Sequence, residues 1–267
     1  MRLFNAVVLA FSFVVSTVHS ATPLEVVERP EWKTFFEHHT AEGTLVVLDQ
    51  RTPRAMVQVH NPKRASTPYL PASTYKIPHA LFALEHGVVK DEFQVFKWDG
   101  KKRDFDVWNS GHNLRSSMRG SVVWVYQWIG QQIGEKAART YLEKAGYGNA
   151  DPSGGKDGYW LDGNIRINAF EQIQFLQKLY TNSLPFKLEH QRLVKDIIIV
   201  EAGKDWILRG KTGWEGRFGW WVGYVEWPDG PVFFALNIDT PNRIGDLPKR
   251  EAITRAVLRS INALPAN

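Results

Sequence analysis

Runs of β-branched and aromatic residues near both ends of the chain predict strands. Residues 43–50 and 55–60 form two such runs, and the segment 51–54 between them (Arg-Thr-Pro-Arg) has the composition of a turn. These runs predict an N-terminal hairpin. Three more predicted strands lie towards the C-terminus, with Pro-Asp-Gly as a tight turn before the last of them: 206–213, 220–227 and 232–239.

Apolar residues at helical spacing occur in the middle of the chain. Residues 134–145 are amphipathic and stop before Gly146, a residue type that ends helices well. Residues 169–180 repeat the pattern, and Asn168 is placed to cap their first turn, with Glu171 three residues further on. Both segments are predicted to be helices.

The order of these elements determines the expected fold class. Strands come from both ends of the chain, the region 71–182 is mostly helical, and residues 248–264 predict a closing helix with Pro248 in its first turn. The sequence has no βαβ alternation, which would indicate a doubly wound fold. We therefore expect an α+β fold, with a central antiparallel sheet flanked by helices and a mainly helical second subdomain.

The first residues predict a targeting signal. Met1 and Arg2 precede an apolar run that is too short to span a membrane, and small residues suit cleavage before Ala21. An N-terminal membrane anchor is the alternative. Once the signal peptide 1–20 is removed, residues 21–267 are expected to form one domain. Its mixed α/β part comprises 21–70 and 183–267, and its helical part comprises 71–182.

Composition narrows the chemistry. Hydrophobic residues make up 43% of the chain and include 11 tryptophans, which is ample for a large core. The absence of cysteine excludes thiol catalysis and thiolate metal sites. The net charge is +5, but 28 acidic residues are interspersed, and the basic cluster 101–103 is better explained as a solvated loop than as a nucleic-acid site. After the N-terminus no stretch of about 18 apolar residues occurs, so we expect no membrane association of the mature protein.

Ser73 and Lys76 are spaced to share one face of a helix. Pro71 precedes them and a helix-forming run follows, so Ser73 is expected at or near a helix N-terminus. Backbone N–H groups and the helix dipole favour a developing negative charge there. A serine with a lysine one turn away supplies a nucleophile and a base, and needs no histidine.

The same Ser-x-x-Lys pattern occurs at Ser153 and Lys156. This copy follows Asp-Pro and encloses two glycines, which predicts a loop. The two side chains then have no reason to face each other, so we interpret this copy as a chance match.

Two further motifs supply additional groups. Lys211, Thr212 and Gly213 lie at the predicted end of a strand, and bring a cation, a hydroxyl and a position without a side chain where a substrate backbone can approach. A plain exposed strand end is the alternative. Ser121 opens a Ser-Val-Val motif and is a second hydroxyl; taken alone, it is better explained as a helix cap for the run that follows.

The order of these motifs resembles that of the penicillin-recognising serine enzymes. A Ser-x-Val motif stands in place of Ser-Asp-Asn, and with three further segments the chain is similar to the class D serine β-lactamases, the oxacillin-hydrolysing family. The resemblance extends from Trp32 to Leu264. The three further segments are 147–149 (Tyr-Gly-Asn), 159–163 (Tyr-Trp-Leu-Asp-Gly) and 218–223 (Phe-Gly-Trp-Trp-Val-Gly).

The resemblance implies that the chain hydrolyses β-lactams through an acyl-enzyme on Ser73 and so confers antibiotic resistance. The family's lysine at this position is carboxylated by CO2, so Lys76 is expected to be N6-carboxylysine and the general base. Val123, Trp160 and Leu161 resemble the residues around that carbamate, to which the Trp160 indole N–H donates. Burial lowers the pKa of a lysine and so supplies the neutral amine that attacks CO2. The resemblance implies CO2 or bicarbonate, but no other cofactor and no metal.

The remaining roles are also implied by the resemblance. Ser121 relays a proton to the leaving lactam nitrogen, and Lys211 assists it. The oxyanion hole consists of the backbone N–H groups of Ser73 and Trp214. Arg250 pairs with the substrate carboxylate, which suits the fork of a guanidinium. The expected substrate-binding residues are Thr212, Gly213, Trp214 and Arg250.

One residue departs from the family's pattern. Tyr75 stands where many members have phenylalanine. Its hydroxyl needs a partner if it is buried. We see no reason for this residue to abolish activity, and its expected effect is on packing near the carbamate.

Other functions are weaker alternatives. A penicillin-binding transpeptidase or carboxypeptidase shares the nucleophile, but the Ser-x-Val motif argues against it. A β-lactam sensor domain stays acylated; such domains end membrane-spanning receptors, whereas a cleavable signal fits a periplasmic enzyme. A metal-dependent β-lactamase is disfavoured because the sequence has no His-Glu-x-x-His motif or zinc-ligand spacing. The expected partners are small-molecule β-lactams, and the protein is expected to be a monomer or a homodimer.

Overall fold

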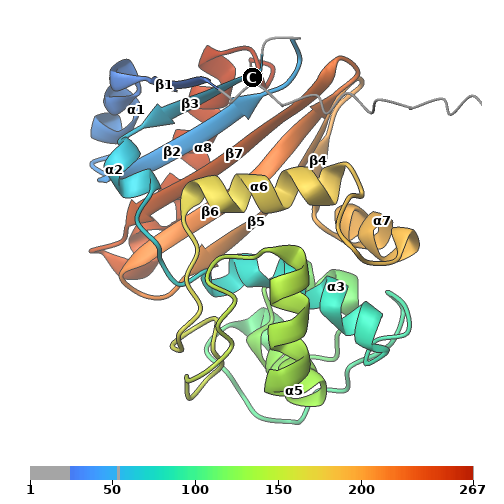
Figure 1. The fold of residues 1–267 in the computed structure, drawn as a ribbon. Helices are drawn as coiled ribbons and strands as arrows, with labels where there is room; N and C mark the ends of the chain where they lie inside the picture. Colours follow the sequence, from blue (N-terminus) through green and yellow to red (C-terminus); the bar gives the residue numbers. More distant parts are fainter. Residues whose placement is uncertain (1–24, 53–54, 267) are drawn as a thin grey trace, which may run out of the picture.

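A mixed sheet forms the centre of the molecule, and helices cover both of its faces (Figure 1). The structure is a computed structural model that describes residues 25–52 and 55–266. The strands of this part are β1 (Glu25–Glu28), β2 (Gly43–Asp49), β3 (Met56–His60), β4 (Ile199–Ala202), β5 (Ile207–Trp214), β6 (Phe218–Trp227) and β7 (Gly230–Asp239). The α-helices are α1 (Lys33–His38), α2 (Pro62–Ala65), α3 (Lys76–His86), α4 (Leu114–Arg119), α5 (Val123–Ala145), α6 (Ala169–Tyr180), α7 (Leu188–Ile197) and α8 (Leu247–Ser260). The 3-10 turns are η1 (Pro30–Trp32), η2 (Ala72–Tyr75), η3 (Asp106–Trp108) and η4 (Arg243–Asp246).

The strand order is β1-β3-β2-β7-β6-β5-β4, and neighbouring strands are antiparallel except for the parallel pair of β1 and β3. The predicted hairpin and the three predicted C-terminal strands are confirmed, as is the central antiparallel sheet. The sequence analysis missed β1 and β4, which form the two edges. Each has only four residues, mostly exposed, so neither shows a clear alternation of apolar and polar positions.

Successive residues of the central strands enter two different cores. In β7, Phe233 and Ala235 belong to the core shared with α3, α5 and α6, whereas Phe234 and Leu236 belong to the core shared with α8. Because side chains alternate across a strand and both faces are covered, β7 is apolar along most of its length. The two layers of helices therefore hold the sheet from both sides (Figure 1).

The predicted helix boundaries agree best where local hydrogen bonds define them. The backbone N–H of Glu171 donates to Asn168 Oδ1 at 2.9 Å, and the backbone N–H of Asn168 donates to Glu171 Oε2 at 2.8 Å, so the predicted cap of α6 is confirmed. Gly146, with φ 62°, ends α5 as predicted. However, α5 begins at Val123, and the predicted start at Gly134 is instead a kink, where φ 71° and ψ 160° interrupt the helix.

The last two helices were predicted less well. The closing helix α8 begins at Leu247, has Pro248 in its first turn as expected, and ends at Ser260, earlier than predicted. The sequence analysis also missed α7.

The predicted signal peptide, residues 1–20, lies outside the described residues. Within residues 25–52 and 55–266, none of the helices has both the length and the apolar character that crossing a membrane requires. The division into a mixed part and a helical part stays a prediction.

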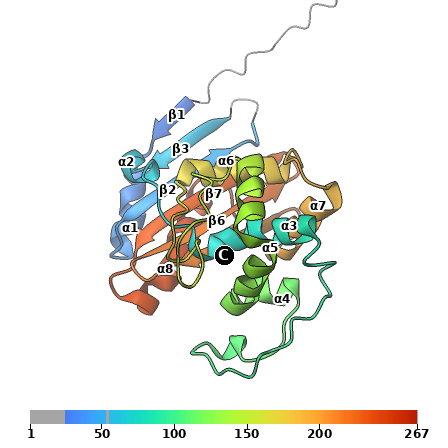
Figure 2. The same cartoon turned by 60° about the horizontal axis from the view of Figure 1, so that its bottom comes forward.

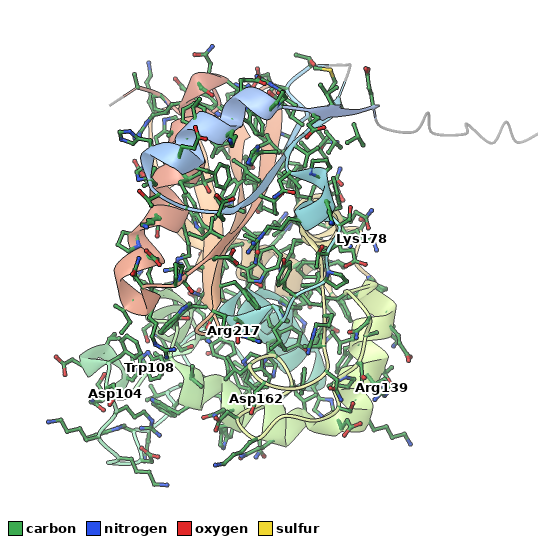
Figure 3. All side chains as sticks on the ribbon, turned by 90° about the vertical axis from the view of Figure 1, so that its left-hand side faces the viewer. Asp104, Trp108, Arg139, Asp162, Lys178 and Arg217 are labelled. Atoms are coloured by element: carbon green, nitrogen blue, oxygen red, sulfur yellow. The ribbon has the colours of Figure 1, made fainter. Side chains whose placement is uncertain are left out.

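The contacts between elements determine where the candidate residues lie. The turn η2 leads directly into α3, strand β5 packs on η2, and α5 packs on α3. Figure 2 shows α3 and α5 side by side. Figure 3 places Arg217, in the turn after β5, at the end of the sheet that meets the helical part, and Asp162 in the loop after α5. The predicted site therefore lies where the sheet and helices meet.

Candidate active site

Ser73 and Lys76 lie together at the start of α3. Ser73 belongs to the turn η2 and Lys76 is the first residue of α3, which confirms the predicted place at a helix start. Lys76 Nζ donates a hydrogen bond to Ser73 Oγ at 2.8 Å. Ala72, just before the serine, has φ 48°, a left-handed conformation that costs energy for a residue other than glycine. The chain therefore holds the serine in a strained turn with its oxygen against an amine.

The surroundings of Lys76 favour its neutral form. Its side chain is fully buried, and Nζ lies 5.1 Å from the centre of the Tyr126 ring. Burial, with a smaller contribution from the charge of Lys211, holds the pKa of Lys76 well below its ordinary value of 10.5. A neutral amine beside Ser73 Oγ has a free electron pair and can act as a base or as a nucleophile.

Two further cations lie buried near the serine. Lys211, in β5, is 6% exposed and Arg250, in α8, is 9% exposed. Burial, and then the charge of Arg250, lower the pKa of Lys211 to about 7. Burial lowers the pKa of Arg250 to about 10, so this residue stays charged at neutral pH. Within the described residues neither side chain forms an ion pair with a carboxylate, so this corner of the site is suited to an anion from outside the protein.

The backbone after Lys211 joins this corner to the nucleophile. Arg250 Nη1 donates to the carbonyl oxygen of Gly213 at 2.8 Å. A Cβ on Gly213 would lie 2.9 Å from the carbonyl oxygen of Pro71 and 3.1 Å from Thr74 Cγ2. Glycine at this position therefore lets β5 lie directly against the turn that holds Ser73, a reason different from the expected approach of a substrate.

The other two expected substrate-binding residues also belong to β5. Lys211 Nζ donates to the carbonyl oxygen of Thr212 at 3.0 Å. The half-buried Trp214 is held from two sides: its indole N–H donates to Thr240 Oγ1 at 3.2 Å, and the Arg243 guanidinium lies 5.6 Å from its ring centre. The structure therefore brings Thr212, Gly213 and Trp214 to the strand end beside Ser73.

Ser121 precedes the helix that borders Lys76. Its φ of 51° is left-handed, Val122 is the N-cap residue of α5, and no side chain caps the helix there. The interpretation of Ser121 as a helix cap is therefore wrong. One turn into α5, Tyr126 presents its ring to Lys76 Nζ, so Ser121 lies at the end of α5 nearest this pocket.

The predicted surroundings of a carbamate include one unusual donor. Trp160 is 2% exposed, and its Nε1 is buried without a hydrogen-bond partner among the described residues. Val123 and Leu161 are half-buried. An unpaired buried N–H costs about 1–3 kcal/mol, so an acceptor held in this pocket would stabilise the protein.

Sequence reasoning missed two residues around Lys76. His79 is fully buried one helical turn beyond Lys76, its ring centre 4.9 Å from that of Trp160, and neither of its nitrogens has a hydrogen-bond partner among the described residues. Tyr159 supplies the partner that the buried Tyr75 needs, since their hydroxyl oxygens lie 2.8 Å apart. In the sequence, His79 could have been found from its spacing of one helical turn from Lys76. Tyr159 could have been found from its position next to Trp160.

His79 should make the protein less stable at low pH. Burial lowers its pKa from 6.5 to about 3, so the unfolded chain takes up a proton first as the pH falls. The free energy of unfolding should drop by about 1.4 kcal/mol per pH unit between those two values and be unaffected by His79 above 6.5. In urea unfolding, the free energy of unfolding of the parent should fall relative to that of His79→Leu as the pH drops below 6.5.

The control for this prediction is His86→Gln, which changes an exposed histidine on the same helix. This variant should keep the pH dependence of the parent. Parallel curves for the parent and His79→Leu from pH 6.5 downwards would show that the His79 ring is not held neutral.

The second Ser-x-x-Lys pattern and the basic cluster both lie in loops. Ser153 and Lys156 lie outside any helix or strand, and Ser153 Oγ accepts a hydrogen bond from Asn164 rather than from the exposed Lys156. The basic cluster 101–103 also lies in a loop, where Arg103 pairs with Asp99 at 2.8 Å. Both segments are therefore loops, as predicted.

Comparisons with known proteins agree with this geometry. The sequence matches the family model described as the penicillin binding protein transpeptidase domain over residues 43–259. It is 60% identical to β-lactamase OXA-20 of Pseudomonas aeruginosa, over 99% of this chain and 97% of that protein, and 46% identical to β-lactamase OXA-48 of Klebsiella pneumoniae, over 97% and 99%. The solved structure of FUS-1 (OXA-85), a class D β-lactamase from Fusobacterium nucleatum subsp. polymorphum, is similar with a TM-score of 0.84 at 37% identity, covering 89% of this chain and 99% of that one.

Proposed function

Since this chain belongs to the class D (OXA) β-lactamases and hydrolyses β-lactams, which confers resistance, we propose that Ser73 carries the acyl group and that Lys76 is the base. One observation carries this assignment: the fully buried Lys76 Nζ contacts Ser73 Oγ at 2.8 Å. Lys211 is the other buried lysine with a lowered pKa, but its Nζ donates to the carbonyl oxygen of Thr212. Lys76 is therefore the better candidate for the proton of Ser73.

Lys76 is proposed to act as an N6-carboxylysine. Two features of the pocket fit such a group: the pKa of Lys76 lies well below 10.5, which leaves the amine free to combine with CO2, and the buried Nε1 of Trp160 has no partner among the described residues. Once carboxylated, Lys76 supplies a carboxylate base in place of an amine. Trp160 would hold this carboxylate through its indole N–H, and Val123 and Leu161 would limit its contact with water.

The chain's own groups perform the other steps. The hydroxyl of Ser73 attacks the lactam carbonyl carbon as its proton passes to Lys76, and the backbone N–H groups of Ser73 and Trp214 stabilise the oxyanion. Ser121 passes a proton to the lactam nitrogen as the C–N bond breaks. Water then hydrolyses the ester, with Lys76 accepting its proton.

The substrate's carboxylate is proposed to bind between β5 and α8. Lys211 and Arg250 are both buried there without an ion pair among the described residues, and Arg250 stays charged at neutral pH. Because neighbouring cations repel each other, an anion that enters between them is held strongly. Thr212 adds a hydroxyl at the same strand end.

Location and assembly are proposed from the sequence. We propose that residues 1–20 direct export to the periplasm and are removed, and that residues 21–267 act as one domain. The protein is proposed to work on small-molecule β-lactams as a monomer or homodimer.

Bicarbonate should control the activity. Turnover of a chromogenic cephalosporin should fall in degassed, mildly acidic buffer, because protonation of Lys76 releases CO2, and should recover when bicarbonate is added. Protein equilibrated with ¹³C-bicarbonate should show a carbamate carbon signal by NMR, and this signal should be missing from Lys76→Ala. Both measurements are made on the full mature chain.

Two outcomes would contradict the proposal in different ways. Turnover that does not change with bicarbonate concentration, together with the lack of a carbamate signal, would mean that Lys76 acts as an uncarboxylated amine. A stable one-to-one acyl adduct without turnover at saturating bicarbonate would instead indicate the sensor function.

A further inference from the structure

Tyr75 lies between the nucleophile and the base in sequence, but its side chain points into the core. The residue is fully buried, and its hydroxyl forms a hydrogen bond of 2.8 Å with the hydroxyl of Tyr159. Its ring stacks on the Trp160 ring, with centres 5.9 Å apart and planes 19° from parallel. One side chain from the nucleophile turn therefore contacts two successive residues of the loop between α5 and α6.

This loop has no helix or strand to hold Trp160 in place. Several of its hydrogen bonds stay inside the loop, such as those from the backbone N–H groups of Lys156 and Asp157 to the Asp162 carboxylate. The bond between Tyr75 and Tyr159 is different because it crosses from the loop to the turn that carries Ser73 and Lys76. The position of the loop relative to Lys76 thus depends on contacts between the loop and this turn, such as the hydrogen bond between Tyr75 and Tyr159.

Trp160 also borders a cavity. A cavity of about 440 Å³ lies beside it, lined by residues of α5 and of the loop, including Tyr159 and Trp160 themselves. A Cβ at Gly158 would lie 2.7 Å from the Trp160 ring, so this part of the loop packs directly on the indole. A shift of the loop towards the cavity would carry the indole away from the rings of Tyr75 and His79, against which it packs.

We propose that the hydrogen bond between Tyr75 and Tyr159 positions Trp160 to donate its indole N–H to the carbamate of Lys76, and thereby sets how tightly the enzyme holds that carbamate. Tyr75 and Tyr159 are positioning residues, since they act through Trp160. This inference rests on the proposed carboxylation of Lys76. Both hydroxyls keep their protons at neutral pH because burial raises their pKa values, so one donates and the other accepts.

The test removes the hydroxyls and keeps the rings. In Tyr75→Phe and in Tyr159→Phe, the bicarbonate concentration that gives half-maximal turnover should rise about three- to tenfold. The same shift should appear in a titration of the ¹³C carbamate signal, which does not depend on turnover. At saturating bicarbonate, KM for the cephalosporin should match the parent. The double variant should need no more bicarbonate than the weaker-binding single variant, since both changes remove one interaction.

Tyr141→Phe is the matched control. It removes a tyrosine hydroxyl that contacts His86 Nδ1 at 3.3 Å on the far part of α5, and its bicarbonate requirement should equal that of the parent. Tyr159, which reaches the surface with 9% of its area, gives the variant expected to fold even if Tyr75→Phe does not.

The outcomes separate this inference from the proposed function. A parent enzyme with a carbamate signal, whose two phenylalanine variants need bicarbonate within twofold of the parent, would overturn the positioning role alone. Additive effects of the two substitutions would overturn it as well. A parent without any carbamate signal would overturn both this inference and the carboxylation of Lys76.

Discussion

Replacing Ser73 by alanine should reduce turnover of a chromogenic cephalosporin by on the order of 10⁴-fold or more. The hydroxyl that forms the ester is lost, and the remaining site can only bind the substrate and stabilise charge. Lys76 then has no oxygen at 2.8 Å to deprotonate. Mass spectrometry of Ser73→Ala after incubation with a penicillin should show no covalent adduct, whereas the parent should show the acyl-enzyme when quenched early.

The chain contains its own control for this experiment. Ser153 is the first residue of the second Ser-x-x-Lys pattern, but it lies in a loop and contacts Asn164. Ser153→Ala should keep turnover within about twofold of the parent, as expected for a change at a loop position. A Ser73→Ala variant that still forms an adduct would place the nucleophile elsewhere.

Replacing Lys76 by alanine should trap the enzyme as an ester. Removal of a general base costs about 10²–10⁴-fold in each step that it serves, and Lys76 is assigned to both acylation and deacylation. The overall turnover should therefore fall at least as far as this range, and the adduct that does form on Ser73 should persist for hours. Mass spectrometry over time, after excess penicillin has been removed, measures this persistence.

Lys156→Ala is the matched control for the base. Lys156 stands three residues after a serine as Lys76 does, but it is exposed in a loop, and the hydroxyl of that serine is hydrogen-bonded to Asn164 instead. This variant should turn over substrate and respond to bicarbonate like the parent. If the Lys76→Ala ester is hydrolysed as fast as the parent's, another group must activate the water, and Lys211 is the next buried lysine to test.

Neither of these two predictions depends on where the helices and strands begin and end, since the sequence and the structure agree on the turn that carries Ser73. The sequence and the structure differ on the residues around this turn. The sequence indicated Gly213 as open space for a substrate, whereas the structure places the carbonyl oxygen of Pro71 2.9 Å from where its Cβ would be. Such a contact joins residues that are far apart in the chain, and no local pattern reports it.

Local signals were sufficient for many of the elements and for the chemistry. The runs of β-branched and aromatic residues in β5 to β7, the cap of α6 and the glycine that ends α5 each depend on neighbours within a few residues, and all were predicted. The order of the Ser-x-x-Lys, Ser-x-Val and Lys-Thr-Gly motifs indicated the family and the reaction for the same reason. The kink at Gly134 and the edge strands were not predicted, because tertiary packing decides them.

Only the tertiary structure decided the electrostatic state of the site. The sequence placed Lys76 beside Ser73, but its low pKa comes from burial under α5 and the loop that follows it. Among 11 tryptophans, packing brings Trp160 against Tyr75 and His79 with its indole N–H unpaired, and Tyr159 against the hydroxyl of Tyr75. Desolvation depends on how distant segments enclose a group. The sequence alone therefore determined which groups are present, and the fold determined which of them are neutral, charged or unpaired.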